Sequence, residues 1–503
     1  MLNQEKNNNC EDSSALSAQL ENVKIKQGLA NNRLLSDSFQ QLAILQLSDK
    51  QLANVSLDLM AEDVPIFMQS YDHLISPWPV IIDKDMLAKF DYICATLPTL
   101  LYKVMTELAK SERQYLLDYL NISELQLDLF LQRNIEIRDV VCRYDAVISN
   151  GVIKLVEANI GTMIGGLHLS WITPQSLNLL KLNDVSKTWN LVDRNGYGNL
   201  FSSVVSYALR EKRHNATGNC VFFLPVQAKE NLELDSQLKY ESLLNTLETV
   251  YKEKLPAHLK GKGKLFFCDS QHDLSLASGN KLCFKDEEVD GIVFHSDTEN
   301  QVPREIYSLL EAGFVDGQYY YPDALAYTLM SIKLLFALVH EIKVKKILTP
   351  EERELVASCI PLSMRLSSEH CLLEGKITSI KTLIENNKDR FVIKKSRSMQ
   401  GNDVMVGRSV DQDTWMAFYN QHKHDSDWLL QEMCIPDDNI CADSTNGVGI
   451  YKMVWGIFSF GGQYSGSFIR AMPENGDSVI NSARGANEFL VFEEQQYKNK
   501  ITL

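Results

Sequence analysis

The chain has 503 residues, of which 45% are hydrophobic and 23% are charged, and its formal net charge is −15. Its length predicts about three structural units with ordinary globular cores. The acidic balance argues against nucleic acid or an anionic membrane surface as the main partner, but it leaves room for a local basic pocket that binds phosphate.

Cysteine spacing and the N-terminus indicate the compartment. Ten cysteines are scattered along the chain and no two form a C-x-x-C pair, which gives no support for a zinc ribbon and favours reduced thiols. The polar N-terminus lacks a basic start and an apolar run, so it does not read as a secretory signal. The most apolar helical stretch, residues 327–339, is too short to span a bilayer and carries Lys333 in its middle. We therefore expect a cytoplasmic protein with no membrane partner.

The first part of the chain is expected to be helical. Residues 1–20 are polar and predict a disordered tail. Residues 21–130 predict a mainly helical region, because apolar residues between 97 and 120 recur at spacings of three and four. Residues 78–82 predict an extended piece, since the residue before a proline avoids the helical conformation.

The hydrophobic period changes between residues 137 and 165. The runs VVCRYDAVI and VIKLVEANI are typical of β-strands, and Asn150-Gly151 lies between them. Asn-Gly between two such runs is the strongest short signal for a β-hairpin. Glycines follow closely, in Gly161-Thr162 and Gly165-Gly166, and such residues allow a ligand to approach the backbone.

This predicted hairpin carries four polar side chains. Arg143 and Asp145 share one face of the first strand, and Glu157 and Asn159 share one face of the second. Carboxylate and amide oxygens suit Mg²⁺, and a nearby arginine can hold a phosphoryl group or an oxyanion. The alternative is a solvent-exposed strand face with ordinary salt bridges.

The remaining chain alternates strands and helices. Residues 195–345 predict a small α/β unit with a largely parallel sheet, built from CVFFLPV, KLFFCDS and GIVFHSD. Thr349, Pro350 and Glu352 predict a capping box at a helix start. DRFVIKKSRSMQGNDVMVG predicts strand, loop and strand, and a later hairpin turns at Gly461-Gly462.

RYDAVISNGVIKLVEANIGTMIGG resembles the metal-binding stretch of the circularly permuted ATP-grasp enzymes, typified by glutathionylspermidine synthetase. The R-x-D element and the following E-x-N element carry the resemblance. It implies that Asp145, Glu157 and Asn159 bind magnesium and that Arg143 stabilises the transition state. In this chain the metal ligands precede the nucleotide lysines, which is the order of the permuted family.

Later segments extend the resemblance to the nucleotide half. Lys394, directly after the strand Phe391-Val392-Ile393, is the candidate phosphate lysine, because Lys394 and Lys395 point to opposite faces. The loop after it contains Gly401 as its single glycine. The candidates for the second nucleotide lysine are Lys333, expected within a helix, and Lys376.

Two further segments complete the predicted site. DWLLQEMCIP resembles the strand and hinge that pair with adenine, with Gln431 and Glu432 as candidate contacts. Arg470 follows an apolar strand and is a candidate for contact with phosphate or a substrate carboxylate. Asn481 and Arg484 lie in a run of small residues where a ligand can approach the backbone.

Together these features predict an α/β (α+β) enzyme with an ATP-grasp core in permuted order, a helical N-terminal region and an inserted α/β unit. The expected units are residues 1–20, 21–130, 131–194 with the metal site, 195–345 as the inserted unit, and 346–503 with the nucleotide-binding lobes. The expected reaction uses ATP and Mg²⁺ to join a carboxylic acid of the amino-acid or peptide type to an amine through an acyl phosphate. The sequence also leaves open a phosphotransferase, a non-catalytic nucleotide- or peptide-binding relative, and a homodimer.

Overall fold

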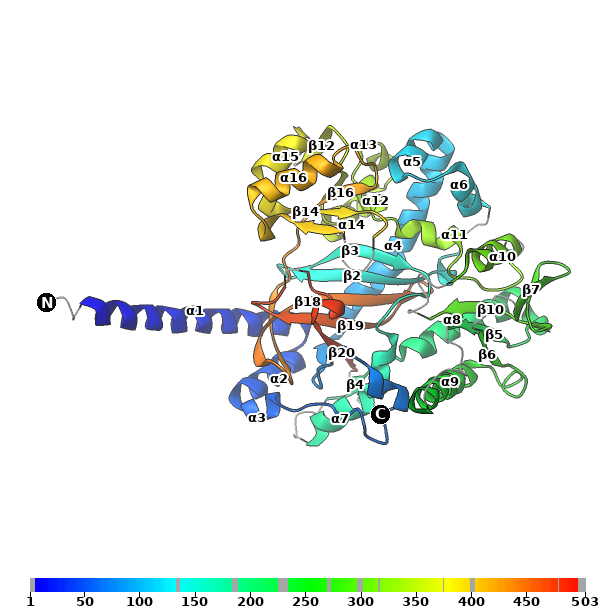
Figure 1. The fold of residues 1–503 in the computed structure, drawn as a ribbon, viewed down its shortest axis with the longest axis horizontal. Helices are drawn as coiled ribbons and strands as arrows, with labels where there is room; N and C mark the ends of the chain where they lie inside the picture. The colour runs from blue at the N-terminus through cyan, green and yellow to red at the C-terminus, as the bar shows by residue number, and fades with distance from the viewer. Residues whose placement is uncertain are drawn as a thin grey trace, which may run out of the picture.

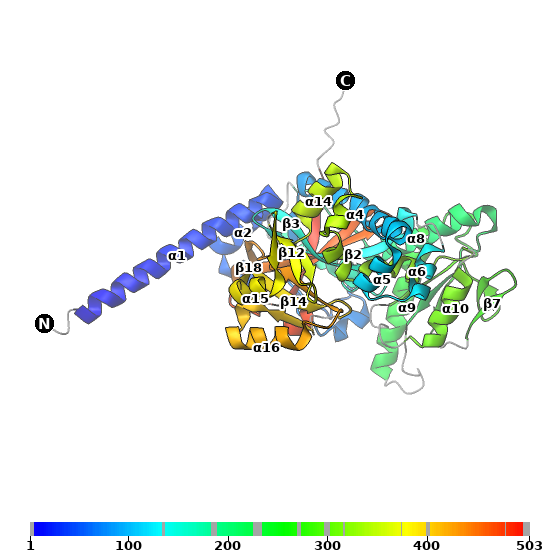
Figure 2. The ribbon, with the colours of Figure 1, turned by 90° about the horizontal axis from the view of Figure 1, so that it is seen from above.

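The structure is a computed structural model that describes most of the chain. The described residues are 5–132, 136–182, 189–224, 234–268, 273–295, 302–314, 317–373, 375–398, 403–477 and 479–495. Helix α1 (Glu5–Leu35) extends away from the body in both views (Figure 1; Figure 2). The expected disordered tail over residues 1–20 is therefore replaced by a helix from Glu5 onward. Extending an existing helix costs much less than nucleating a new one.

The region up to residue 130 is mainly helical, as its apolar periodicity predicts. Its elements after α1 are α2 (Asp37–Ser48), α3 (Lys50–Ala53), η1 (Ile66–Ser70), β1 (Val80–Ile82), α4 (Lys84–Ser111), α5 (Arg113–Leu120) and α6 (Glu124–Leu131). The extended piece predicted at residues 78–82 contains β1. This strand is fully buried and pairs in parallel with β20 (Asn487–Glu494), so it belongs to the main sheet.

An eight-stranded mixed sheet forms the centre of the molecule (Figure 1). Its path runs β1-β20-β19-β18-β2-β3, and β17 pairs with β18 while β4 pairs with β20. The remaining bounds are β2 (Val141–Ser149), β3 (Val152–Ile160), β4 (Leu191–Val192), β17 (Asp438–Asp443), β18 (Gly447–Phe460) and β19 (Gln463–Pro473). The sheet thus combines strands from the predicted units 21–130, 131–194 and 346–503.

Both predicted hairpins are confirmed within this sheet. Strands β2 and β3 turn at Asn150 and Gly151, with φ angles of 52° and 72°. Strands β18 and β19 turn at Gly461 and Gly462, with φ angles of 68° and 70°. Two-residue turns with both central φ values positive match the twist of the strands that they connect.

The inserted unit lies beside the central sheet (Figure 1), and its main three-stranded sheet is parallel, as predicted. Its strands are ordered β10 (Gly291–Phe294), β5 (Cys220–Phe223) and β6 (Leu265–Cys268). The other elements of the unit are α8 (Gly196–Glu211), α9 (Leu234–Lys254), α10 (Arg304–Phe314) and the hairpin strands β7 (Leu274–Ala277), β8 (Lys281–Phe284) and β9 (Glu287–Glu288). The segments η3 (Leu167–Ile172) and α7 (Thr173–Leu182) precede it in the chain. All residues of β5 and β10 are buried, which is typical of a parallel sheet covered on both faces.

A smaller four-stranded sheet, the small lobe, lies above the central sheet in Figure 1. Its order is β11 (Ser363–Arg365), β16 (Trp428–Glu432), β14 (Phe391–Lys395) and β15 (Val404–Val406). The hairpin β12 (His370–Leu373) and β13 (Lys376–Ser379) and the helices α15 (Ile380–Asn386) and α16 (Gln412–His422) complete it.

Short helices connect the inserted unit to the small lobe. They are α11 (Leu325–Thr328), η8 (Leu329–Ser331), α12 (Leu334–Leu338), α13 (Ile342–Lys345) and α14 (Pro350–Cys359). The predicted capping box at α14 is confirmed: Thr349 and Glu352 bind each other's backbone N–H groups. Among the described residues, no helix is long and apolar enough to cross a membrane.

Candidate functional site

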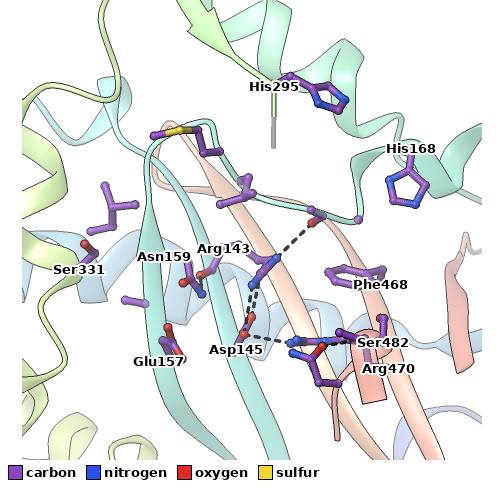
Figure 3. A pocket seen from close by; sticks show the side chains of 18 of the residues that line it. Arg143, Asp145, Glu157, Asn159, His168, His295, Ser331, Phe468, Arg470 and Ser482 are labelled. Atoms are coloured by element: carbon purple, nitrogen blue, oxygen red, sulfur yellow. Dashed lines mark hydrogen bonds and ion pairs between the residues drawn. The ribbon is translucent and has the colours of Figure 1, made fainter. Parts of the chain in front are cut away.

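Four predicted site residues lie on neighbouring strands of the central sheet (Figure 3). In the β2–β3 hairpin, Asp145 is directly opposite Glu157, and Arg143 is directly opposite Asn159. Opposite residues of an antiparallel pair project to the same face of the sheet. The convergence that the sequence predicts for these four side chains is therefore present.

Asp145 is held between two guanidinium groups. Its carboxylate accepts hydrogen bonds from Arg143 Nε at 2.8 Å and Nη2 at 3.2 Å, and its Oδ2 lies 2.9 Å from Arg470 Nη2 on β19. Burial alone would raise the pKa of this carboxyl, but the two arginines outweigh burial and lower it. Asp145 is therefore ionised near neutral pH and already neutralised by its neighbours.

Glu157 and two lysines form a second charged group beside the first. Lys333 Nζ lies 2.9 Å from Glu157 Oε1 and donates to the carbonyl oxygen of Ser398 at 2.5 Å. Lys394 Nζ donates to the carbonyl oxygen of Val156 at 2.7 Å. Burial and the charge of Lys333 lower the pKa of Lys394 to about 8, although Glu157 opposes the shift. Both lysines thus point at the β2–β3 hairpin.

The position of Lys333 differs from the expectation. It lies between η8 and α12, as the N-cap residue of α12, and not in the middle of one long helix. Ile332 is extended, with φ −60° and ψ 117°, and this conformation interrupts the helix. The lysine therefore reaches the site from a break in the backbone, and its side chain is only 10% exposed.

Arg470 carries a donor that no described residue accepts. Its side chain is 10% exposed, and its Nε is buried without a hydrogen-bond partner among the described residues. A buried guanidinium donor without an acceptor destabilises a protein unless a ligand oxygen takes the bond. The cluster holds four cationic side chains and two carboxylates, so its net charge is positive. It suits an anion such as a phosphoryl group or a carboxylate.

Two cavities meet at this cluster. The interlobe cavity, of about 640 Å³, lies between the central sheet and the small lobe. The body cavity, of about 790 Å³, lies on the side of His168 and His295 (Figure 3). The residues that line both are Asp145, Glu157, Lys333, Ser398, Arg470 and Asn481. A group bound at this junction can therefore contact ligands in both cavities.

The interlobe cavity has two apolar walls with polar ends. The apolar side chains that line it include Val392, Val404 and Val406 of the small lobe and Val147, Val454 and Met472 of the central sheet. Lys394 projects into it from the small lobe. Its partner in the cross-strand register is the buried Leu429, whereas Lys395 is paired with Trp428. Lys394 and Lys395 alternate along the strand, as predicted, and Lys395 also lines this cavity.

The predicted adenine contacts lie at the end of β16. Gln431 Nε2 donates to Ser363 Oγ at 2.9 Å, and Glu432 pairs with Arg390 at 2.9 Å. Both candidates line the interlobe cavity. The backbone N–H groups of Glu432 and Met433 already donate to backbone carbonyls, so a base paired with this hinge would use other groups.

Of the other predicted residues, some line the cavities and some do not. Asn481 lines both cavities, whereas Arg484 pairs with Asp477 at 3.2 Å and lines neither. Lys376 is exposed on the β12–β13 hairpin and lines neither cavity, so the geometry favours Lys333 as the second lysine. Gly401 lies outside the described residues.

The glycines after β3 approach protein groups. A Cβ at Gly161 would lie 2.4 Å from Asp323 Oδ1, and one at Gly166 would lie 2.4 Å from Phe468 Cδ1. Asp323 accepts hydrogen bonds from the backbone N–H of Thr162 and from its hydroxyl, at 2.7 and 2.6 Å. These two glycines therefore allow Asp323 and Phe468 to pack closely against the backbone of the site wall. The sequence predicted instead that a ligand would approach the backbone there.

Sequence reasoning missed Phe468. Its ring lies against both arginines, with the Cζ atoms of Arg143 and Arg470 at 5.7 and 5.6 Å from the ring centroid. Gly456 is paired with both Phe468 and Asp145 in the sheet, and a Cβ there would lie 2.2 Å from the ring. The ring thus fills the space above a glycine and orients two guanidinium groups. A phenylalanine in an apolar strand gives no sequence signal for that role.

A second missed feature lies beside Arg470. Glu488 on β20 is directly opposite Arg470 in the sheet and is 4% exposed. It accepts hydrogen bonds at 2.6 Å from Tyr71 Oη and from Ser482 Oγ, and His168 Nε2 lies 3.7 Å from it. These four side chains all line the body cavity, and no local sequence pattern connects them.

The donor set fits a nucleotide better than it fits three protein ligands to magnesium. Cationic side chains, an unpaired buried donor and apolar walls suit a triphosphate and a purine ring. Both oxygens of Asp145 are engaged by arginines, so a cation at Asp145 would compete with them. Glu157 and Asn159 supply oxygens of the type that Mg²⁺ prefers. No group of three or more His, Cys, Asp or Glu side chains with metal-site geometry occurs in the described part of the chain.

Comparison with known proteins supports the fold. No protein-family model matches the sequence, and no curated protein matches it. A glutathione synthetase-like effector from Globodera pallida, solved in its apo form, matches with a TM-score of 0.51 and 13% identity, over 91% of this chain and 98% of that chain. A candidate gamma-glutamylcysteine synthetase from Methylobacillus flagellatus KT covers 79% of this chain and 88% of its own, with a TM-score of 0.34 and 10% identity. The first match shows a mixed α/β fold similar to that of a glutathione synthetase-like protein.

Proposed function

We propose that this chain is an ATP-dependent ligase of the permuted ATP-grasp type, which joins a carboxylic acid of the amino-acid or peptide type to an amine. The observation that carries the proposal is the junction of the two cavities at one cationic cluster. One cavity has the apolar walls and lysines that suit a nucleotide, and the other has room for a second substrate. A phosphoryl group at the junction is within reach of both.

The chain's own residues supply binding and orientation. Lys394 and Lys333 neutralise phosphate oxygens in the interlobe cavity. Arg470 and Arg143 orient the substrate carboxylate and the oxyanion that develops when its carbonyl is attacked. Glu157 and Asn159 are the residues that would hold Mg²⁺, which when bound shields phosphate charge. The carboxylate takes the γ-phosphoryl group, and an amine then displaces phosphate from the acyl phosphate.

The test is ADP release with pools of carboxylic acids and amines, in the wild type and in Glu157→Ala. We expect Mg²⁺-dependent ADP formation that requires an acid and, for turnover, an amine. Glu157→Ala should lower the rate by about 100-fold or more, because it removes both a metal ligand and the partner of Lys333. Unchanged ATPase activity in this variant would contradict the site.

A second candidate function is a non-catalytic nucleotide- or peptide-binding protein. The pairing of Asp145 with two arginines favours it, because one of the three expected metal ligands is already neutralised. The fold match to a protein described as an effector points the same way. Thermal stabilisation by ATP without turnover in any pool would support this candidate. ADP formation without a second product would instead indicate a phosphotransferase.

A further inference from the structure

The body cavity contains an acid–histidine pair that phosphoryl transfer does not use. Glu488 on β20 and His168 on η3 face each other, with Oε2 and Nε2 3.7 Å apart. His168 lies on the side of Phe468 and Ser482 (Figure 3), and Glu488 lines the same cavity. Because Glu488 is directly opposite Arg470 in the sheet, the pair borders the place where an activated carboxyl would sit.

The surroundings fix the carboxylate and leave the imidazole incompletely bonded. Tyr71 Oη and Ser482 Oγ each donate to Glu488 at 2.6 Å, and the Tyr71 ring lies 4.5 Å from the His168 ring, centroid to centroid. His168 Nε2 is buried and has no hydrogen-bond partner among the residues that the structure describes. A buried ring nitrogen beside a fixed carboxylate is a prepared site for one proton.

The charges around the ring agree with that role. Burial opposes ionisation of Glu488, but contacts with His168, Ser482 and Tyr71 outweigh it and lower its pKa to about 2. Tyr71 lies against the His168 ring, His73 packs on Tyr71, and Arg470 lies opposite Glu488 in the sheet. The ionised Glu488 carboxylate therefore lies beside the His168 ring.

We propose that His168 is the general base that takes a proton from the attacking amine, and that Glu488 is the residue that positions it. This inference rests on the proposed ligase function. The amine enters as an ammonium ion and gives one proton to the neutral imidazole. Its lone pair then forms the C–N bond at the acyl carbon, the C–O bond to phosphate breaks, and the second N–H proton leaves with the phosphate. No oxidant, reductant or further reactant is required.

The test compares two nucleophiles on one enzyme. Hydroxylamine is largely uncharged at neutral pH and attacks acyl phosphates without a base, whereas amino acids are ammonium ions. With a pool of amino acids and dipeptides as carboxyl donors, hydroxamate formation is measured beside amide formation with amino acids as amines. We expect His168→Gln to lower amide formation by about 100-fold while hydroxamate formation stays within about twofold of wild type. Retained hydroxamate formation also shows that the variant is folded and activates the carboxylate.

Two further variants sharpen the result. Glu488→Gln should lower kcat for amide formation with little change in KM for the acid, because it removes the charge that steadies protonated His168. His214→Gln, on an exposed histidine of η4 (Arg213–Asn215), serves as the matched control and should leave both reactions unchanged. Equal loss of both reactions in His168→Gln, or no loss of either, would overturn the assignment. Absence of hydroxamate in the wild type with every acid would instead contradict the ligase function itself.

Discussion

The central sheet and the small lobe use their apolar residues differently. The central sheet belongs to the main hydrophobic cluster, which runs on through the N-terminal helices and the inserted unit. The small lobe has a separate cluster, in which Trp415 of α16 is buried together with Trp428 and Leu430 of β16 and with apolar residues of α15. Along β16, Leu429 belongs to the main cluster while its neighbours on both sides belong to the small one. Leu429 thus joins the small lobe to the main core on the side of β11 and β16.

This difference explains where the cavity forms. Strands β11 and β16 pack on α12, whereas β14 and β15 face the central sheet across the interlobe cavity. On the open side the described contacts include polar ones, such as Lys394 to the carbonyl of Val156 and Lys333 to the carbonyl of Ser398. The two hydrophobic cores are in contact on the side of β11 and β16, and the interlobe cavity lies on the side of β14 and β15. A nucleotide can occupy that cavity without displacing core residues.

The largest effect is expected from a substitution that disrupts only the hydrophobic core of the small lobe. Trp415 is fully buried, and its indole N–H donates to the carbonyl of Ile384 at 3.0 Å. Trp415→Ala should destabilise the small lobe by about 3–5 kcal/mol, because a large cavity remains. Thermal unfolding should then show an early transition for the lobe and a later one for the rest, with loss of ATP binding.

The matched control is Trp455→Ala, on the fully buried tryptophan of β18 in the main core. It should destabilise the main body by a similar amount and lower the main transition. A single cooperative transition for both variants would contradict the separation of the two cores.

The second prediction concerns the junction between the cavities. Arg470→Met keeps the bulk of the side chain but removes the unpaired donor and one of the two cations on Asp145. We expect kcat/KM to fall by about 100–1,000-fold, as for the loss of an oxyanion-binding group. Arg138→Met is the control, since Arg138 forms an exposed ion pair with Glu136. An equal loss of activity in both variants would show that the effect is not specific to the junction.

The third prediction tests the glycine beneath Phe468. Gly456→Ala should push the ring away from Arg143 and Arg470, because the new Cβ would lie 2.2 Å from it. The expected cost is about 1–3 kcal/mol in the free energy of unfolding, with a larger relative loss of activity than of stability. Gly261→Ala is the matched control, because nothing lies within 4 Å of a Cβ there. Full activity in Gly456→Ala would show that Phe468 does not orient the two arginines for activity.

The smallest expected effect is a pH dependence from Lys394. Its pKa of about 8 lies below the ordinary value of 10.5, so above pH 8 the free enzyme loses the charge that attracts phosphate. ATP affinity should fall by about fivefold between pH 8 and 9 and by about tenfold per pH unit above that, as proton uptake on binding approaches about one proton. Calorimetry in buffers of different ionisation enthalpy measures that proton, and Lys394→Met should abolish it.

The same shift has the opposite sign for stability. Between pH 8 and 10.5 the unfolded chain binds more protons at this lysine than the folded one, so its contribution to the free energy of unfolding rises with pH over that window. Affinity that falls while stability rises would distinguish Lys394 from general alkaline unfolding. An ATP affinity that stays constant up to pH 10 would show that Lys394 is not the residue that contacts phosphate.

The sequence by itself determined the local pieces. Alternating apolar residues and Asn150-Gly151 specify the β2–β3 hairpin, because a strand has a period of two and this dipeptide adopts the required turn. That hairpin brings Asp145 opposite Glu157 without any other part of the chain. The capping box at Thr349 and the parallel inserted sheet follow from equally local patterns.

Only the tertiary structure decided which groups meet. Arg470 reaches Asp145, and Glu488 reaches His168, across separations in sequence of more than 300 residues, through long-range packing that no local pattern encodes. The break beside Lys333 lies where α12 packs against the small lobe. Side-chain period fixes the face on which a residue lies, whereas the order of strands in a sheet fixes its neighbours. The charge states and interaction partners of the site residues are therefore set by the tertiary structure.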